Sequence, residues 1–391
     1  MRIAHLADIH LGFRQYHRQN PLGINQREAD VANAFRAAVD AVLAARPDAV
    51  LLAGDLFHQV RPSNTAIVFA FQQFQRLRHD LPEAPIVVIA GNHDTPRSSE
   101  TGSILRLYEE MGVDVALDQP RRFEYPLLDL SILAVPHQAL REGERPVLRP
   151  DGSATRQVLL LHGELEGVYP PEISGATWGG VLIHPDEIHA DEWSYVALGH
   201  YHVQHQVGPR VWYAGAMEYA TSNPWGELRD ETRKGIPGKG WLMVDLDRRK
   251  VTRQPALKAR RVVDLPPVYA DELGAEEVDR LIRERLASIE GGWKDQIVRL
   301  LVFNVPRQVA RELDHAAIRE VKASALHFHL DLRRPVVGPG GAVDPGARRK
   351  PLAEVLRDFL DHRPLPAELD REAFVQAGVG LLAAVVREED A

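Results

Sequence analysis

The sequence predicts an α/β protein in which buried strands alternate with helices. Short apolar runs recur along the first 258 residues, and amphipathic stretches separate the first three of them. Polar residues whose side chains can bind metals or transfer protons come directly after several of these runs. Buried strands that alternate with helices are typical of a layered sheet with covered faces. The expected strands are residues 2–7, 49–53, 86–90, 131–135, 157–161, 195–198 and 241–246.

Two helices are expected between the first three strands. In residues 29–45, one helical face carries Val31, Phe35, Val39, Val42 and Leu43. The second helix, residues 63–80, is apolar almost all round its first half. Part of that surface packs under the sheet, and the surplus indicates either a partner helix or further core packing.

The pattern restarts on a smaller scale after residue 258. Strands are expected at 262–263, 296–304 and 325–332, and helices at 275–289 and 307–323, which together make a small α+β capping unit. Residues 335–350 are rich in Gly and Pro and read as a linker. A pair of helices is expected after it. The predicted domains are therefore 1–258, 259–334, the linker 335–350, and 351–391.

Composition narrows the classes of function. A chain of 391 residues favours two or three domains. The absence of cysteine excludes disulfide, iron–sulfur and cysteine–zinc chemistry. A net charge of −8 argues against a polyanion binder held by bulk charge. It leaves room for a nucleic-acid enzyme, because bound metals and local arginines can supply the positive field. The N-terminus has no apolar signal region, and we expect a cytoplasmic protein that does not enter a membrane.

Polar side chains gather at the ends of five predicted strands. Sites in layered α/β sheets form at the carboxyl ends of strands, so we expect these ends to converge on one rim. A single Asp or His after a strand is usually a cap or a surface group, and only the complete set is specific. The strand ends are Asp8-Ile9-His10, Gly54-Asp55, Gly91-Asn92-His93-Asp94, His162 and Gly199-His200-Tyr201-His202.

These ligand types predict a metal centre. Carboxylate, amide oxygen and imidazole suit Mn²⁺, Fe²⁺ or Zn²⁺ better than Mg²⁺. Seven candidates are too many for one ion, but they suit two ions about 3.5–4 Å apart, bridged by a carboxylate and a water-derived hydroxide. Asp55 is the expected bridge, since it is the lone carboxylate at its strand end. Asp8 and His10 are expected to share an ion, because residues two apart on an extended segment face the same side.

The set D-x-H, G-D, G-N-H-D, H and G-H-x-H resembles the calcineurin-like metallophosphoesterases. Within that family, LADIHLG, AGDLFHQVRPS, AGNHD, LLLHGEL and LGHYH resemble the SbcD nucleases, bacterial counterparts of the eukaryotic meiotic-recombination nuclease. The phosphoprotein-phosphatase branch has Asp where this chain has His58, which favours the nuclease branch. The resemblance implies a β-sandwich flanked by helices, with a capping domain and C-terminal helices.

The resemblance also implies roles for the strand-end residues. It implies two Mn²⁺ ions, with Fe²⁺, Zn²⁺ or Mg²⁺ as other candidates. His93 would stabilise the transition state or protonate the leaving oxygen, and His58 would position the strand being cut. Asp94 would either orient His93 or cap the following turn. One ion would be held by Asp8, His10, Asp55 and His202. The other would be held by Asp55, Asn92, His162 and His200.

The implied activity is hydrolysis of DNA phosphodiester bonds. By resemblance, the protein is a double-strand 3′–5′ exonuclease and a single-strand or hairpin endonuclease, associated with the nucleoid. Another phosphoesterase activity, on cyclic nucleotides or phosphoproteins, is the alternative. The residues themselves give neither the polarity of cleavage nor the native metal.

Contacts with DNA and partners are implied less specifically. Basic and aromatic residues near the motifs are either phosphate contacts or solvated turns, and residues 223–240 are read as a basic loop. The candidate DNA contacts are Arg14, Tyr16, Arg18, Arg61, Arg233 and Lys234. The candidate homodimer contacts are Ile67, Val68 and Phe71. An SMC-like ABC ATPase, SbcC, would dock on Leu352, Val355, Leu356, Phe359 and Leu360, unless these fold back on the capping unit.

Overall fold

The computed structural model describes residues 1–96, 102–141, 145–168, 179–257, 259–335, 352–361, 370–378 and 380. By its contacts the chain divides into two compact units. The first comprises Met1–Val268, Glu276–Leu301 and Leu313–Asp331, and the second comprises the remaining segments. The predicted domain boundaries at residues 258 and 334 stay predictions, since these units follow contacts alone.

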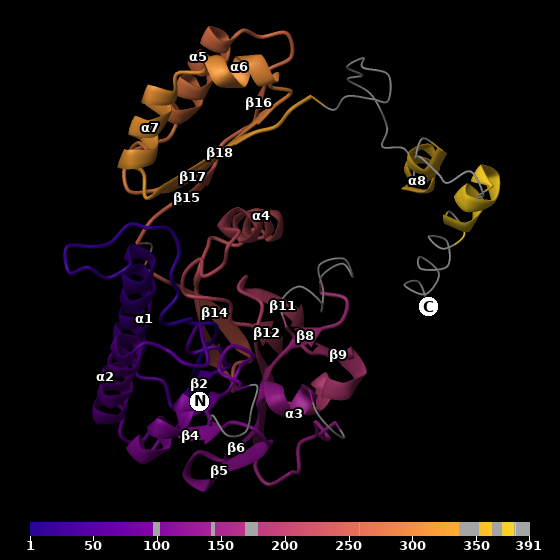
Figure 1. The fold of residues 1–391 in the computed structure, drawn as a ribbon. Helices are drawn as coiled ribbons and strands as arrows, with labels where there is room; N and C mark the ends of the chain where they lie inside the picture. Colours follow the sequence, from indigo (N-terminus) through magenta and orange to yellow (C-terminus); the bar gives the residue numbers. More distant parts are fainter. Residues whose placement is uncertain are drawn as a thin grey trace. The chain divides into compact units, whose positions relative to one another are not determined.

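A six-stranded sheet forms the first layer of the larger unit (Figure 1). Neighbours from β1 to β4 are parallel, whereas β13 and β14 join the sheet antiparallel. Helices α1 (Gln26–Ala45) and α2 (Asn64–Asp80) pack against each other and cover one face. The strand order is β14 (Lys250–Pro255), β13 (Gly240–Asp245), β1 (Arg2–Leu6), β2 (Ala49–Leu52), β3 (Ile86–Ile89) and β4 (Asp114–Ala116).

A second six-stranded sheet packs against the other face of the first. Side chains alternate along each strand. Leu52 therefore lies in the core under the helices, while Leu51 lies between the sheets with Val158 and Ala197. The strand order is β11 (His205–Gly208), β12 (Val211–Tyr213), β10 (Tyr195–Gly199), β7 (Arg156–His162), β6 (Leu130–Val135) and β5 (Arg121–Tyr125).

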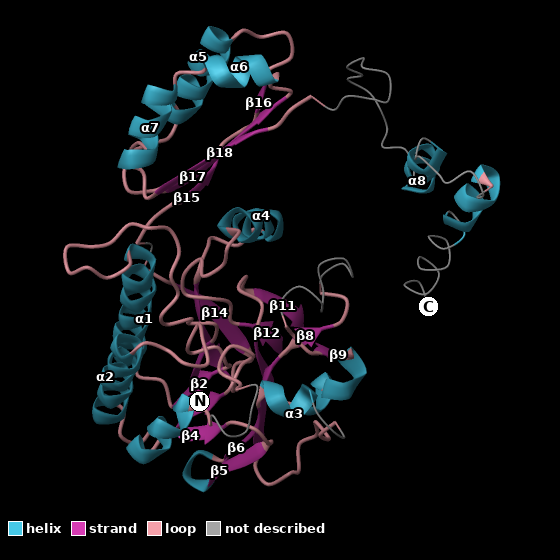
Figure 2. Ribbon diagram, in the orientation of Figure 1, coloured by secondary structure: helices cyan, strands magenta, loops and turns pink. Residues whose placement is uncertain are grey.

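Short helices cover the outer face of the second sheet, opposite α1 and α2 (Figure 2). They are α3 (His137–Arg141) and the 3-10 helices η3 (Pro185–Ile188) and η4 (Ala190–Glu192). A two-stranded sheet, β8 (Glu164–Leu165) with β9 (Leu182–Ile183), follows β7. The predicted fold class, a β-sandwich flanked by helices, is confirmed.

A further four-stranded sheet follows β14 in the chain. Its helices are α5 (Ala275–Ala287), α6 (Arg307–Glu312) and α7 (His315–Ser324). The single helix expected at 307–323 is wrong, because Asp314 caps α7 by accepting from the amides of Ala316 and Ala317. The strands are β15 (Val262–Asp264), β17 (Ile297–Phe303) and β16 (Val268–Tyr269) in order, with β18 (His327–Leu332) paired to β17.

The reading of residues 223–240 as a loop is also wrong. The helix α4 (Pro224–Lys234) occupies most of that segment. Asn223 caps it by accepting from the amide of Gly226, Pro224 opens the first turn, and Gly235 ends it with a φ of 64°. Proline at the first position and glycine just past the end are ordinary helix boundaries.

Beyond the linker, α8 (Leu352–Asp361) and a helical segment at 371–378 are described. A Cβ added to Gly378 would lie 2.3 Å from Cδ1 of Leu360, so these two segments pack closely on each other. Residues 336–350 of the predicted linker lie outside the described residues. Among the helices that are described, none is long and apolar enough to cross a membrane.

Candidate metal centre and active site

The ligand candidates leave their strands through strained turns. Asp8, His10 and Asp55 have φ values of 51°, 54° and 53°, and His200 has 112°. Positive φ is uncommon outside glycine, although Asp and His tolerate it best. The expectation that Asp8 and His10 share a side because their segment is extended is therefore wrong. Their turn back toward the sheet is fixed instead by the Asp8 and His10 amides, which donate to the carbonyls of Gly54 and Asp55.

One group of side chains comprises Asp8, His10 and His202. Each offers a ligand atom within 4.8 Å of the others. Nε2 of His10 lies 3.0 Å from Nε2 of His202. Strands β1 and β10 belong to different sheets, so this group closes only where the sandwich is complete.

A second group lies beside the first and comprises Asn92, His162 and His200. Oδ1 of Asn92 lies 2.9 Å from Nε2 of His162 and 3.1 Å from Nδ1 of His200. Asp55 lies between the groups, with Oδ2 3.5 Å from Nε2 of His162 and 3.8 Å from Nε2 of His10. The structure thus brings all seven predicted ligands close together. A further group, Asp8 with Asp55 and His162, joins the two sets that the resemblance implies, so the division between two ions stays a prediction.

Hydrogen bonds on the outer side of each imidazole fix which nitrogen faces the centre. Nδ1 of His162 donates to the carbonyl of Ala53 at 2.7 Å, so its Nε2 carries a lone pair. Nε2 of His200 faces Oε1 of Glu164 at 3.1 Å, so its Nδ1 is the nitrogen turned toward the centre. Two imidazole nitrogens and the amide oxygen of Asn92 thus face one another. This set of ligand atoms fits a divalent ion.

His202 is held in the same way. Its Nδ1 lies 2.9 Å from Oε1 of Glu227, so its Nε2 is the nitrogen turned toward His10. A carboxylate behind a metal-binding histidine fixes the tautomer and raises its basicity. Neither Glu164 nor Glu227 is among the candidate site residues predicted from the sequence. Glu164 lies two residues after His162 on β8, whereas Glu227 could be found only by recognising α4.

Three glycines let the backbone approach the ligands. A Cβ on Gly54 would lie 2.3 Å from Nδ1 of His162, and one on Gly91 would lie 2.2 Å from Oδ1 of Asp55. A Cβ on Gly199 would lie 1.8 Å from the carbonyl oxygen of Ala53. Each distance is shorter than any side chain tolerates, so glycine is required at these strand ends.

The electrostatics favour the protonation states that a metal needs at His162, His10 and Asp55, but not at Asp8. Burial lowers the pKa of His162 to about 4, so this imidazole is neutral near pH 7. Burial also lowers the pKa of His10. Burial raises the pKa of Asp55, but the neighbouring His162 and His93 outweigh it and the net shift is downward. Burial and the nearby Asp55 raise the pKa of Asp8, which is the repulsion that bound cations would relieve.

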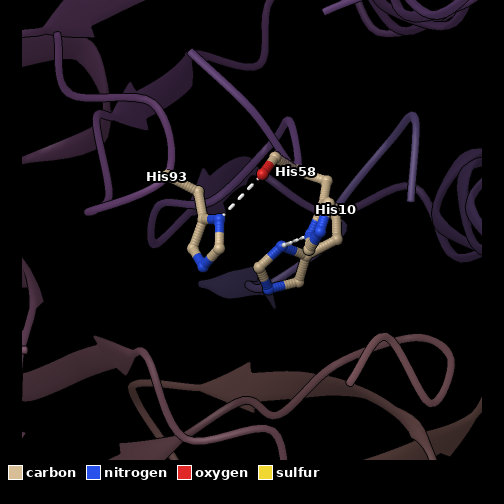
Figure 3. A group of neighbouring side chains, drawn as sticks. All are labelled: His10, His58 and His93. Atoms are coloured by element: carbon tan, nitrogen blue, oxygen red, sulfur yellow. Dashed lines mark hydrogen bonds between the residues drawn. The ribbon is translucent and has the colours of Figure 1, made fainter. Parts of the chain in front are cut away.

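His93 and His58 lie at the edge of the centre, next to His10 (Figure 3). Nδ1 of His93 donates to the backbone carbonyl of His58 at 2.8 Å. Its amide donates to Oδ1 of Asp55 at 2.8 Å. Nδ1 of His58 lies 3.4 Å from Nδ1 of His10, and burial with the nearby His93 lowers the pKa of His58 to about 4.

Asp94 lies behind these residues. Its carboxylate accepts from the amides of Leu56, Phe57 and Gly91 at 3.0–3.1 Å. Burial and the charge of Asp55 raise its pKa to about 7. The ring of His93 is held by a carbonyl instead. Of the two alternatives for Asp94, this geometry favours support of the loops over orientation of His93.

The candidate DNA contacts are mostly engaged within the chain. Arg14 pairs with Glu28 at 2.7 Å. The ring of Tyr16 stacks on His327 with centroids 4.1 Å apart, and Arg18 donates to the carbonyls of Ser324 and Ala325.

The remaining basic candidates lie further out. Arg61 is exposed on the loop that follows β2. Arg233 lies on α4 and approaches Asp230 at 3.5 Å. Lys234, also on α4, has its pKa lowered by burial. The positions of these residues neither support nor contradict a contact with DNA, so the DNA contacts stay predictions.

The dimer candidates lie on α2. Ile67 is partly buried against the core, while Val68 and Phe71 are 55% and 37% exposed.

The partner-binding candidates lie on α8. Phe359 is 56% exposed and Leu360 is buried, while Leu356 is half-buried. The side chains of Leu352 and Val355 lie outside the described residues.

Carboxylates and imidazoles converge here at the strand ends of a two-sheet sandwich. This arrangement is typical of metal-dependent hydrolases. Residues 1–215 match the calcineurin-like phosphoesterase family, and the chain belongs to that family. The expected family is confirmed.

The chain is also similar to proteins named DNA double-strand break repair protein Mre11. That of Sulfurisphaera tokodaii is 30% identical over 255 residues, covering 62% of this chain and 59% of the relative. That of Methanopyrus kandleri is 28% identical over 302 residues, covering 72% and 62%. That of Archaeoglobus fulgidus is 26% identical over 355 residues, covering 84% and 74%. The chain thus spans about three fifths of the length of the first two relatives.

Proposed function

We propose that this protein is a DNA nuclease that hydrolyses phosphodiester bonds at a two-metal centre. The observation that carries the proposal is the convergence of the ring nitrogens of His162, His200 and His202 on one centre with Asp8 and Asp55. Similarity to the double-strand break repair proteins supports DNA as the substrate. Mn²⁺ fits the mixed imidazole and carboxylate donors.

Two divalent ions bound there would supply charge neutralisation and an activated water for attack on phosphorus. The chain's own residues would provide the charge and the fixed geometry of the site. The carboxylates of Asp8 and Asp55 would supply the negative charge that holds the ions, while His10 and His162, whose pKa values burial lowers, would add ligand atoms without further charge. The buried strand ends fix these groups in advance, so little reorganisation is needed when a phosphodiester arrives.

His93 is the candidate for proton transfer. Because its Nδ1 donates to a carbonyl, which can only accept, its Nε2 is free to hold or give up a proton. The backbone amide of His93 donates a hydrogen bond to Oδ1 of Asp55, which ties the position of His93 to the proposed bridging carboxylate. A proton held at Nε2 is suited to stabilising the transition state or protonating the leaving sugar oxygen.

We further propose double-strand 3′–5′ exonuclease and single-strand or hairpin endonuclease activities, with a partner ATPase of the SbcC type docking on α8. A homodimer through α2 belongs to the same proposal. Val68 and Phe71 are one helical turn apart, so their exposed side chains share a face. The exposed Phe359 supports docking on α8.

The first test is digestion of end-labelled linear duplex DNA by the purified protein in Mn²⁺. Covalently closed duplex and the His93→Ala variant run alongside. Shortening of the linear duplex alone, lost in the variant, is the expected result. Cleavage of bis-(p-nitrophenyl) phosphate without digestion of DNA, even with the ATPase added, would instead favour a small phosphodiester as substrate.

A further inference from the structure

We propose that α4 is a positioning element that ties the strands β15 and β18 to one of the two metal sites. It would act through Glu227, which holds His202, and through Trp225, which packs against those strands. The inference rests on the proposed two-metal function. It goes beyond it by predicting that the two sites respond differently to changes in α4.

At the metal end, α4 fixes both the ring and the backbone of His202. Oε1 of Glu227 lies 2.9 Å from Nδ1 of His202. Lys239 pairs with Glu227 and also donates to the carbonyl of His202 at 3.0 Å. The side chain of Lys239 is 4% exposed and pairs with Glu231 at 2.9 Å. This ammonium therefore joins two turns of α4 to His202 inside the protein.

At the other end, Trp225 is buried against the strands that follow the sandwich. Its indole Nε1 donates to the carbonyl of Val263 on β15 at 3.1 Å. Its ring lies 5.4 Å from His329 and 6.1 Å from His327, both on β18. The guanidinium of Arg299 lies 5.0 Å from the ring. Trp225 also joins a small core with Val262, Ile297 and Leu326.

Trp225 and Glu227 are only two residues apart in one helix. Two residues correspond to about 200° around the axis, so the side chains leave α4 in nearly opposite directions. A rigid shift of Trp225 is therefore carried to Glu227. A displacement of about 0.3 Å would stretch a 2.9 Å hydrogen bond to the upper end of its usual range, about 3.2 Å.

The second metal site has different support. His200 is backed by Glu164 on β8, and His162 by the carbonyl of Ala53 at the end of β2. Neither of those partners belongs to α4. A change in α4 should therefore weaken the site that contains His202 and spare the site that contains His162 and His200.

The test is a Mn²⁺ titration of the full chain in which paramagnetic resonance measures free Mn²⁺. The variants are Glu227→Gln, which removes the charge, and Trp225→Phe, which removes the indole bond to β15. Trp193→Phe is the matched control, because Trp193 is also buried and donates to a carbonyl at 2.9 Å, that of Ile188. Glu290→Gln, at an exposed position, controls for charge.

We expect the wild type and both controls to bind two ions with the same affinities. Glu227→Gln should weaken one ion by about 10–100-fold, the usual effect of losing a carboxylate behind a ligand histidine. Trp225→Phe should weaken the same ion by a smaller factor. Unchanged affinities in Glu227→Gln, or equal weakening of both ions, would overturn this inference but not the proposed function. A wild type that binds no pair of ions would overturn the proposed function as well.

Discussion

The backbone carbonyl of His58, not its side chain, holds the ring of His93 at 2.8 Å. The two residues come from the ends of different strands, β2 and β3, and their rings stack with centroids 5.1 Å apart. Their contributions can therefore be separated by mutation, because truncation of the His58 side chain keeps the carbonyl that orients His93.

The first prediction concerns His93→Ala. We expect kcat for phosphodiester cleavage to fall by about 10²–10⁴-fold, the usual contribution of a positioned proton donor. The number of Mn²⁺ ions bound should not change, since His93 is not needed as a ligand. Steady-state kinetics and a Mn²⁺ titration on the same preparation check both points. His58→Ala should lose less activity than His93→Ala, and the reverse order would contradict the role given to His93.

The second prediction concerns Asp94. Its three amide partners would be left unsatisfied in Asp94→Ala, so we expect a loss of about 1–3 kcal/mol or more in the free energy of unfolding. Asp94→Asn keeps one accepting oxygen and should lose less. Urea unfolding of the metal-free protein measures both. A variant of unchanged stability with reduced kcat would show that Asp94 acts on His93 after all.

The third prediction uses the close approach of Gly91 to Asp55. In Gly91→Ala the new Cβ would meet Oδ1 and the amide of Asp55 at 2.2 and 2.5 Å, so Asp55 must move. We expect the Tm of the wild type to rise with Mn²⁺, because the ion binds only the folded state, and the Tm of Gly91→Ala to stay unchanged. Gly274→Ala is the control, since its Cβ would meet nothing within 4 Å. A normal response to Mn²⁺ in Gly91→Ala would rule out this constraint.

The fourth prediction is that the free energy of unfolding depends on pH through His5, which lies between the two sheets. His5 is fully buried, and burial lowers its pKa from 6.5 to about 3. Below pH 6.5, His5 is protonated in the unfolded chain but stays neutral in the folded chain. Acid therefore favours unfolding. This residue should therefore cost up to about 1.4 kcal/mol per pH unit as the pH falls from 6.5 toward 3.

The comparison for this prediction is His5→Gln, which removes the titrating group. Its free energy of unfolding should fall less steeply than that of the wild type between pH 6.5 and 4. Equal slopes in urea unfolding would show that His5 is accessible to protons in the folded state.

Much of the sandwich could be predicted because its central strands are continuous apolar runs. Strand β14 could not, since its side chains are largely exposed and leave no apolar pattern. Helix α4 was missed for another reason. Its segment was read as a basic loop, although Pro224 and Gly235 mark the beginning and the end of the helix.

The candidate ligands could be placed because each follows a buried strand directly. The residues behind them could not. Glu227 reaches His202 only through the packing of α4, and no spacing in the sequence encodes that contact. The same holds for Tyr16 and Arg18, which contact residues more than 300 positions away. Local patterns therefore predicted the ligands, whereas tertiary packing decided their partners.

The centre draws its ligands from Asp8 through His202, and strand β1 is completed by β13, which ends at Asp245. The ribosome must therefore synthesise well over half of the chain before the candidate ligands can come together. A chain stalled or cut short during synthesis would carry several of the right side chains and still lack the site. If the proposed hydrolysis takes place at this centre, it would therefore arise only in a protein whose two sheets have both been synthesised and packed together.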